Sequence, residues 1–129
     1  MMKVALLLLC VIFGCAFGFR YFVIGHLRCG TKPANGVKVT LYNDENGDGV
    51  INIKTDFACE GITALDGSFR LKSLVMGAVF VVRHNCNYEG GPKTMKILIS
   101  NNYISSHLRH NNVNIGAHNL QDNITEIHL

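Results

Sequence analysis

Alternating apolar and polar residues run through most of the chain. In the segment VKVTLY, the side chains of Val37, Val39 and Leu41 fall on one face and the remaining three on the other. The same alternation recurs in SFRLK, TMKILI and NVNIGA, at 68–72, 94–99 and 112–117. Because successive side chains of a β-strand point to opposite faces of a sheet, this pattern predicts half-buried strands.

Two other segments are more continuously apolar. YFVIGHLR at 21–28 and VFVVRH at 79–84 are rich in aromatic and β-branched residues. Such runs predict strands that are buried on both sides or lie near the centre of a sheet. Turn signals separate the predicted strands, namely KPANG at 32–36, LDG at 65–67 and NYEGGPK at 87–93. Asp66-Gly67 in particular predicts a two-residue hairpin.

The spacing of these segments indicates the fold class. No segment of ten or more residues keeps a helical period, and no internal repeat occurs. Seven or eight short strands separated by regular turns predict a single all-β domain, either a sandwich or a barrel.

The N-terminal segment differs from the rest in composition. After Met1-Met2-Lys3 comes the apolar run VALLLLCVIF at 4–13, followed by the small residues GCAFG. A run this short at the N-terminus predicts a secretory signal peptide rather than a membrane span. We therefore expect residues 1–18 to be removed and residues 19–129 to form a soluble, extracellular domain.

Charge excludes one class of partner. The chain carries a formal net charge of +3 at pH 7, with 12 Lys and Arg residues against 9 Asp and Glu residues. The cationic residues are scattered rather than clustered, so the sequence does not predict binding to nucleic acid.

Three of the five cysteines follow the predicted signal peptide, namely Cys29, Cys59 and Cys86. In an oxidising compartment, this odd number predicts one disulfide and one leftover thiol, which is either buried or paired with another chain. All three pairings remain open at this point. A zinc site is not expected, because His84 and Cys86 form the only close pair of suitable ligands.

The stretch YNDENGDGVIN at 42–52 resembles the first half of an EF-hand loop. Asp44, Asn46 and Asp48 occupy its first, third and fifth positions. Thr55 stands where an EF-hand needs a bidentate Glu, and a strand rather than a helix leads into the loop, so an EF-hand is excluded. Two interpretations remain, a weak calcium site outside that fold or a polar turn in which Asx side chains bond their own backbone.

Other candidate chemistry is sparse. His107, His110 and His118 lie in an Asn-rich stretch without acidic neighbours, which favours surface histidines over a metal site. No G-x-S-x-G nucleophile elbow and no phosphate-cradling loop occur, so the sequence predicts no enzyme and no cofactor beyond the weak calcium candidate. The sequon NIT makes Asn123 a candidate glycosylation site.

Several motifs together resemble the nematode transthyretin-like family. They are, in family order, GHLRCGTKPANGVKVTLY at 25–42, GSFRL at 67–71, HNC at 84–86, Tyr103-Ile104, and IGAHNL at 115–120. The resemblance implies a secreted, transthyretin-like sandwich of two β-sheets with about one disulfide. It also implies that Cys29 and Cys86, at the ends of the first and fifth strands, could pair at one edge of the sandwich. Cys59 would then be the leftover thiol, and a monomer or a dimer linked through Cys59 would be expected.

The resemblance also frames the expected function. The related enzymes that hydrolyse 5-hydroxyisourate depend on a His and Arg cluster and a C-terminal Tyr-Arg-Gly-Ser, whereas this chain ends in NITEIHL. We expect a non-enzymatic binding module for a lipid, a small apolar ligand or another extracellular or cell-surface protein, with contacts at 44–52 and 101–112. The alternatives are a related hydrolase that needs Arg83 and His84, and a disulfide-linked structural or assembly protein.

Overall fold

A computed structural model describes residues 21–44, 46–73, 77–86, 91–122 and 124–129. The predicted signal peptide and the sequon residue Asn123 therefore lie outside the described residues. In the part of the chain that is described, no helix is long and apolar enough to cross a membrane.

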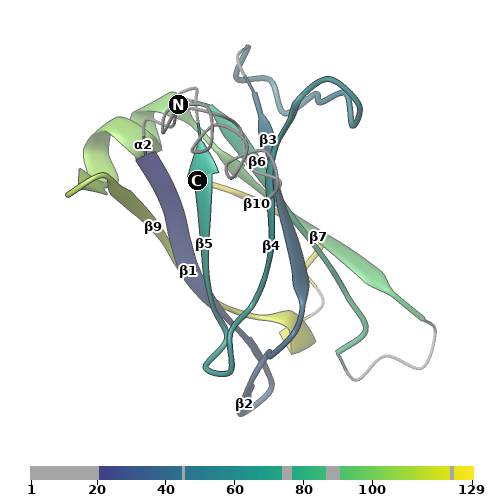
Figure 1. Cartoon of the computed structure of the whole chain (residues 1–129). Helices are drawn as coiled ribbons and strands as arrows, with labels where there is room; N and C mark the ends of the chain where they lie inside the picture. The colour runs from purple at the N-terminus through teal and green to yellow at the C-terminus, as the bar shows by residue number, and fades with distance from the viewer. Residues whose placement is uncertain (1–20, 45, 74–76, 87–90, 123) are drawn as a thin grey trace, which may run out of the picture.

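Two sheets pack against each other in the described chain (Figure 1). In the first sheet, β1 (Tyr21–Cys29) pairs with β2 (Lys32–Pro33), β5 (Ser68–Ser73) and β9 (Asn112–Asn119), and β9 pairs with β8 (Leu108–Arg109). The second sheet has the order β10 (Glu126–His128), β7 (Lys93–Ile99), β6 (Ala78–His84), β3 (Lys38–Asn43) and β4 (Phe57–Ile62). The pairs β1–β9 and β10–β7 are parallel, and the other pairs are antiparallel. The predicted all-β, two-sheet sandwich is confirmed.

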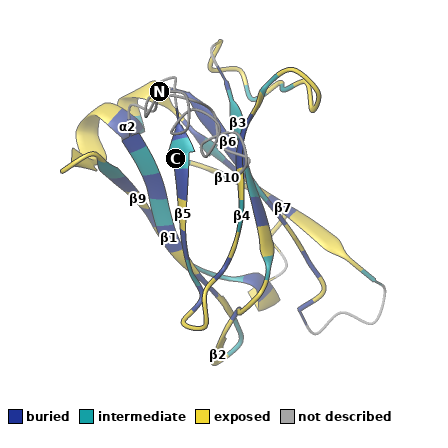
Figure 2. Ribbon diagram, in the orientation of Figure 1, coloured by how far each residue is buried: buried dark blue, intermediate teal, exposed yellow. Residues whose placement is uncertain are grey.

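The core lies between the sheets and consists of the apolar positions that the alternation identifies. Val39 and Leu41 of β3 are fully buried, and Phe69 of β5 stacks on Phe80 of β6 across the sandwich, with ring centroids 4.6 Å apart. Figure 2 shows buried and more exposed positions alternating along the strands. Burial of each such side chain contributes about 1.5–3 kcal/mol, which makes the interface between the sheets the main source of stability.

The two continuously apolar segments behave differently. Val79 and Phe80 at the start of β6 are both fully buried, so that strand is covered on both sides, as predicted. In β1, by contrast, burial alternates, and Phe22 and Ile24 are only half-buried. The prediction for such runs was burial on both sides or a place near the centre of a sheet, and β1 meets the second alternative, because it lies between β5 and β9.

Strand β9 departs from simple alternation at Gly116, where φ is +90°. From Ile24 to His26, β1 advances by two residues. The partner positions on β9 advance by three residues, from Asn114 to Ala117. This β-bulge turns Ala117 outward, so its predicted place beside the buried Val113 and Ile115 is not observed.

The Asp66-Gly67 turn does not close a hairpin. It follows β4 of the second sheet and leads into β5 of the first, and the Gly67 N–H donates to Ala64 O at 2.9 Å. Gly67 has a φ of +82°, and a Cβ there would meet the backbone of Leu27. The turn is thus a corner between sheets, which the dipeptide alone does not distinguish from a hairpin.

Two short helical segments were not predicted. Helix α2 (Asn101–His107) begins after Ser100, whose Oγ accepts the Tyr103 N–H at 3.1 Å as an N-cap. A single 3₁₀ turn, η1 (Leu120–Asp122), follows β9. Both are shorter than the ten-residue window in which a helical period would be recognised.

A disulfide joins the two sheets at one end. It links Cys29, at the end of β1, to Cys86, just beyond β6, with a Cα–Cα distance of 5.7 Å across 57 positions of sequence. The pairing that the family resemblance implies is therefore confirmed. Closing a loop of this length in the unfolded chain stabilises the fold by about 4 kcal/mol in the chain-entropy model.

Cys59 does not have the role expected for it. It lies in β4 opposite Leu41, belongs to the core and is 1% exposed. It is itself disulfide-bonded. The sequence predicted a leftover thiol that is either buried or paired with another chain. The burial of Cys59 is observed, but the prediction that it is a free thiol is wrong.

Candidate binding sites

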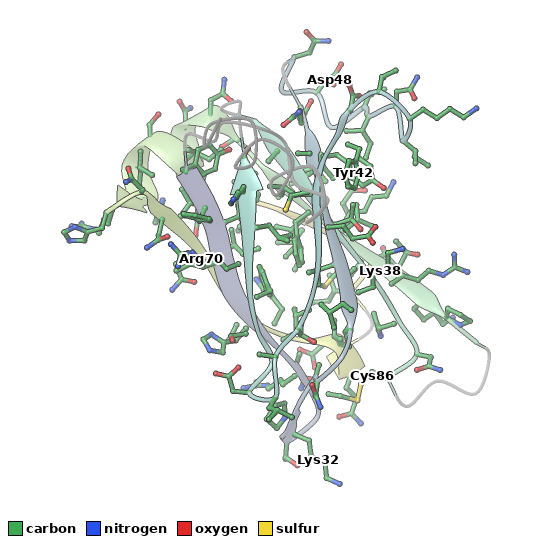
Figure 3. The ribbon with its side chains drawn as sticks, in the orientation of Figure 1. Lys32, Lys38, Tyr42, Asp48, Arg70 and Cys86 are labelled. Carbon is green, nitrogen blue, oxygen red and sulfur yellow. A yellow bond between two sulfur atoms is a disulfide. The ribbon has the colours of Figure 1, made fainter. Side chains whose placement is uncertain are left out.

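The loop between β3 and β4, residues 44–56, projects from one end of the sandwich. Figure 3 shows Asp48 in the part of this loop farthest from the sheets. The Asn43 N–H donates to Asp56 O at 2.7 Å, and the Asp44 N–H donates to Gly77 O at 2.9 Å. These bonds fix both ends of the loop to the sheet and to each other.

Asp44 is the buried residue of the calcium candidate and is 5% exposed. Its Oδ2 accepts the Gly49 N–H at 3.0 Å, and its carbonyl oxygen accepts the Gly47 N–H at 3.1 Å. The carboxylate therefore points into the loop. Its Oδ1 is buried without a hydrogen-bond partner among the described residues.

The other two calcium candidates lie in the solvent-exposed part of the loop. Asp48 Oδ1 accepts the Val50 N–H at 3.0 Å, and Asn46 is exposed. Gly47 and Gly49 both have positive φ, as the polar-turn interpretation expects. No group of three His, Cys, Asp or Glu side chains that could hold a metal occurs in the described parts of the chain.

The second half of the loop presents apolar side chains to solvent. Val50 is 75% exposed and Ile53 is 72% exposed. Between them, Asn52 fixes the backbone: its Oδ1 accepts the Lys54 N–H at 2.9 Å, and its own N–H donates to Asp56 Oδ2 at 2.6 Å. The loop is thus held in shape by polar bonds while its apolar side chains remain uncovered.

The second predicted contact region, 101–112, consists of α2, β8 and a tight turn. Tyr103 stacks on His107, with ring centroids 3.8 Å apart, and its hydroxyl donates to Asn114 O at 2.9 Å. His107 and His118 are each bonded to a nearby backbone carbonyl, and His110 lies in the turn. The structure therefore uses these side chains locally and does not gather the three histidines.

A cleft of about 740 Å³ opens at the opposite end of the molecule, next to the disulfide. Its walls are residues 29–38, which run from the end of β1 to the first residue of β3, residues 83–86 at and just beyond the end of β6, and Leu120 and Gln121 of η1. Figure 3 places Lys32 and Cys86 at this end, away from Asp48. No sequence signal indicates the cleft, because its three walls come from distant parts of the chain.

His84 lies in the wall of this cleft and is 8% exposed. Its Nδ1 accepts the Cys86 N–H at 3.3 Å, so in the neutral ring the proton is on Nε2. Burial lowers the pKa of the imidazole below its ordinary value of 6.5, because the charged form loses solvation. Both residues on which the hydrolase alternative rests, Arg83 and His84, line the cleft.

A family model for TTR-52, described as the transthyretin-like family, matches residues 24–100. The chain belongs to this family. The match covers the strands from β1 to β7 and both cysteines of the intersheet disulfide, and it supports an extracellular type of binding module at a general level. No curated protein matches the chain.

Two solved structures resemble the transthyretin-like chain at low identity. A 9R-lipoxygenase from Cyanothece PCC8801 is 12% identical, with a TM-score of 0.47, over 78% of this chain and 16% of its own. The dioxygenase domain of a dioxygenase carbohydrate-binding protein fusion from Streptomyces sp. SirexAA-E is 15% identical, also with a TM-score of 0.47, over 80% of this chain and 81% of its own. This chain thus spans about a sixth of the lipoxygenase, and neither likeness carries an argument about its function.

Proposed function

We propose that this transthyretin-like protein is a secreted, non-enzymatic binding module that contacts its ligand through the β3–β4 loop. Secretion is supported by the family and by the Cys29–Cys86 disulfide, since disulfides persist in oxidising extracellular compartments. Binding loops on a rigid sandwich are a common way in which such folds acquire function.

The exposure of Val50 and Ile53 on a fixed loop is the observation that carries this proposal. Covering apolar surface contributes about 25 cal/mol per Å². Since Asn52 and Asp56 already hold the backbone, little conformational entropy is lost when a ligand packs on the loop. A lipid, a small apolar ligand or the apolar surface of another extracellular protein would gain from this contact.

The test compares three forms of residues 19–129, immobilised and exposed to extracellular fluid and lipid extract from the organism that produces the protein. They are the wild type, Val50→Ser/Ile53→Ser, and Leu65→Ser as the matched control. Leu65 is 82% exposed but lies in the corner before β5. We expect mass spectrometry to find material retained by the wild type and by Leu65→Ser that is reduced at least tenfold on the double variant. Equal retention by all three forms would refute a role for the loop.

A weak calcium site in the same loop is the second function that an observation favours. Asp44 Oδ1 is a buried acceptor without a partner in the described chain, and a buried, unpaired carboxylate oxygen is costly. Calcium takes oxygen ligands, and Asn46 and Asp48 of the same loop carry further side-chain oxygens. Extracellular calcium modules have dissociation constants of about 10⁻⁴–10⁻³ M.

Thermal unfolding tests this site directly. We expect a saturable rise in Tm as calcium increases to about 10 mM, with no comparable rise in magnesium and reversal by a chelator. The calcium-dependent increment should vanish in Asp44→Ala and Asp48→Ala and persist in Asp122→Ala, an exposed carboxylate on η1. If the Tm of the wild type does not change with calcium, residues 44–48 are a polar turn and not a calcium site.

A further inference from the structure

The cleft beside the disulfide has the size and construction of a small-molecule site. Its volume of about 740 Å³ falls within the range of roughly 300–1,000 Å³ that is typical of ligand pockets. It lies at the end of the sandwich opposite the β3–β4 loop, so it is independent of the surface that the proposed function uses (Figure 3).

A disulfide and several hydrogen bonds hold the walls of the cleft in place in the free protein. The disulfide links the end of β1 to the residue beyond β6. Asn119 Oδ1 accepts both the Gly30 N–H at 2.9 Å and the Gln121 N–H at 3.0 Å. These two bonds join the turn between β1 and β2 to η1. Thr63 fixes the turn within residues 29–38, because its Oγ1 donates to Ala34 O at 2.6 Å and accepts the Val37 N–H at 2.8 Å. A preformed cleft of this kind loses little entropy on binding.

The charged residues in the described lining of the cleft are all cationic. Lys32, Lys38 and Arg83 line it, and its described lining includes no Asp or Glu. Lys38 Nζ lies 3.3 Å from Glu60 Oε2, in an exposed pair that neutralises part of its charge. Neither Lys32 nor Arg83 forms an ion pair with a described carboxylate. Among the described residues, the positive charges of Lys32 and Arg83 therefore have no carboxylate partner, and such charges attract anions.

The rest of the lining is mixed in polarity. Pro33 and Val37 contribute apolar surface, and Asn35, Asn85 and Gln121 contribute amide groups. An Arg guanidinium can bind a carboxylate or a phosphate through two parallel hydrogen bonds. This combination suits a molecule with an anionic head and a short apolar body rather than a bare ion or a neutral hydrocarbon.

We propose that this cleft binds a small amphipathic anion, a carboxylate or a phosphate monoester, whose head contacts Arg83 and Lys32 and whose apolar body packs against Pro33 and Val37. The site gives the protein a soluble-ligand function beside the contact surface of the β3–β4 loop.

Titration calorimetry with defined probes tests the site on oxidised residues 19–129. The probes are octanoate, octyl phosphate, inorganic phosphate and octanol, each below its micelle concentration. We expect octanoate or octyl phosphate to bind at least tenfold more tightly than octanol and than inorganic phosphate. The difference between octanoate and octyl phosphate identifies the preferred head group. Equal binding of octanol and octanoate, or no binding of either anion, would overturn the proposal.

Matched variants locate the binding. Lys32→Gln/Arg83→Gln should lose at least tenfold in affinity for the preferred anion. Lys96→Gln/Arg109→Gln removes the same two charges from exposed positions outside the cleft and should bind like the wild type. An equal loss in both double variants would indicate attraction to net charge alone and would contradict the site.

Amide chemical-shift mapping on the wild-type protein gives a measurement that does not depend on how the variants fold. The anion should shift residues 29–38 and 83–86, and shifts confined to other residues would refute the location. If the anion does not bind in the cleft, the comparison of Val50→Ser/Ile53→Ser with Leu65→Ser still tests the β3–β4 loop. The proposals for the cleft and for the loop can therefore be refuted independently.

Discussion

At the scale of single residues, the positive φ of certain glycines and the burial of polar side chains such as Asp44 and His84 have the largest expected effects on stability. The sequence identified Asp44 and Asp48 as oxygen donors, but it could not distinguish the buried carboxylate from the exposed one, because both follow the same strand closely. It did not identify His84 as a cleft residue either, since its burial depends on chain segments distant in sequence.

Gly67→Ala should destabilise the fold more than Gly47→Ala. Both glycines have positive φ, so each alanine incurs backbone strain of about 1 kcal/mol. At Gly67 the new Cβ also meets the backbone of Leu27, whereas at Gly47 nothing lies within 4 Å. Urea unfolding should therefore show a clearly larger loss for Gly67→Ala, and equal losses would contradict the tight corner between the sheets.

His84 should make stability depend on pH. Because burial lowers its pKa, the unfolded chain binds the proton more readily than the folded chain does. Its contribution is fully present above the unfolded-state pKa of about 6.5 and is lost as pH falls below that value through the lowered folded-state pKa.

The matched measurement follows Tm from pH about 7.5 to about 5, a window that contains the ordinary His pKa. The decrease should be smaller in His84→Asn, which keeps an acceptor for the Cys86 N–H, than in the wild type. His110→Asn, in an exposed turn with positive φ that Asn tolerates, should behave like the wild type. Identical profiles for all three proteins would contradict the burial of a neutral His84.

At the scale of elements, the period-two pattern predicted the strands well, because the alternation of buried and exposed side chains is a local property. The errors occur where an element is too short or a neighbour intervenes. Helix α2 spans 7 residues, the bulge at Gly116 reverses the face of Ala117, and the Asp66-Gly67 turn joins different sheets. The helix depends on its N-cap, and the bulge and the turn depend on contacts with other strands. The period of apolar residues along the sequence contains no information about either.

The N-cap of α2 gives the test at this scale. Ser100→Ala removes the acceptor for the Tyr103 N–H and should cost about 1 kcal/mol. Ser105→Ala, within the same helix, is the control and should change stability by less than about 0.5 kcal/mol. Chemical denaturation of the two variants decides between a capped helix and an irregular loop.

At the scale of the whole molecule, the assembly of two sheets was accessible from the sequence largely through the family motifs. The same motifs implied the Cys29–Cys86 bond, whereas cysteine spacing alone left three pairings open. The cleft was not accessible at all, since it exists only where the disulfide, η1 and the end of β6 converge.

The disulfide should contribute to global stability. Cys29→Ala/Cys86→Ala should lower the free energy of unfolding by about 2–5 kcal/mol without changing the strand content. Circular dichroism and urea unfolding of the double variant measure both quantities. A loss below about 1 kcal/mol would show that the sheets hold this end together without the covalent link.

The central claim is that a fixed loop with uncovered apolar side chains makes this transthyretin-like protein a binding module. The retention of extracellular lipids and proteins by the wild type, by Val50→Ser/Ile53→Ser and by Leu65→Ser tests it most directly. The account predicts material that is retained by the wild type and Leu65→Ser and lost by the double variant. Material retained equally by all three forms would contradict it.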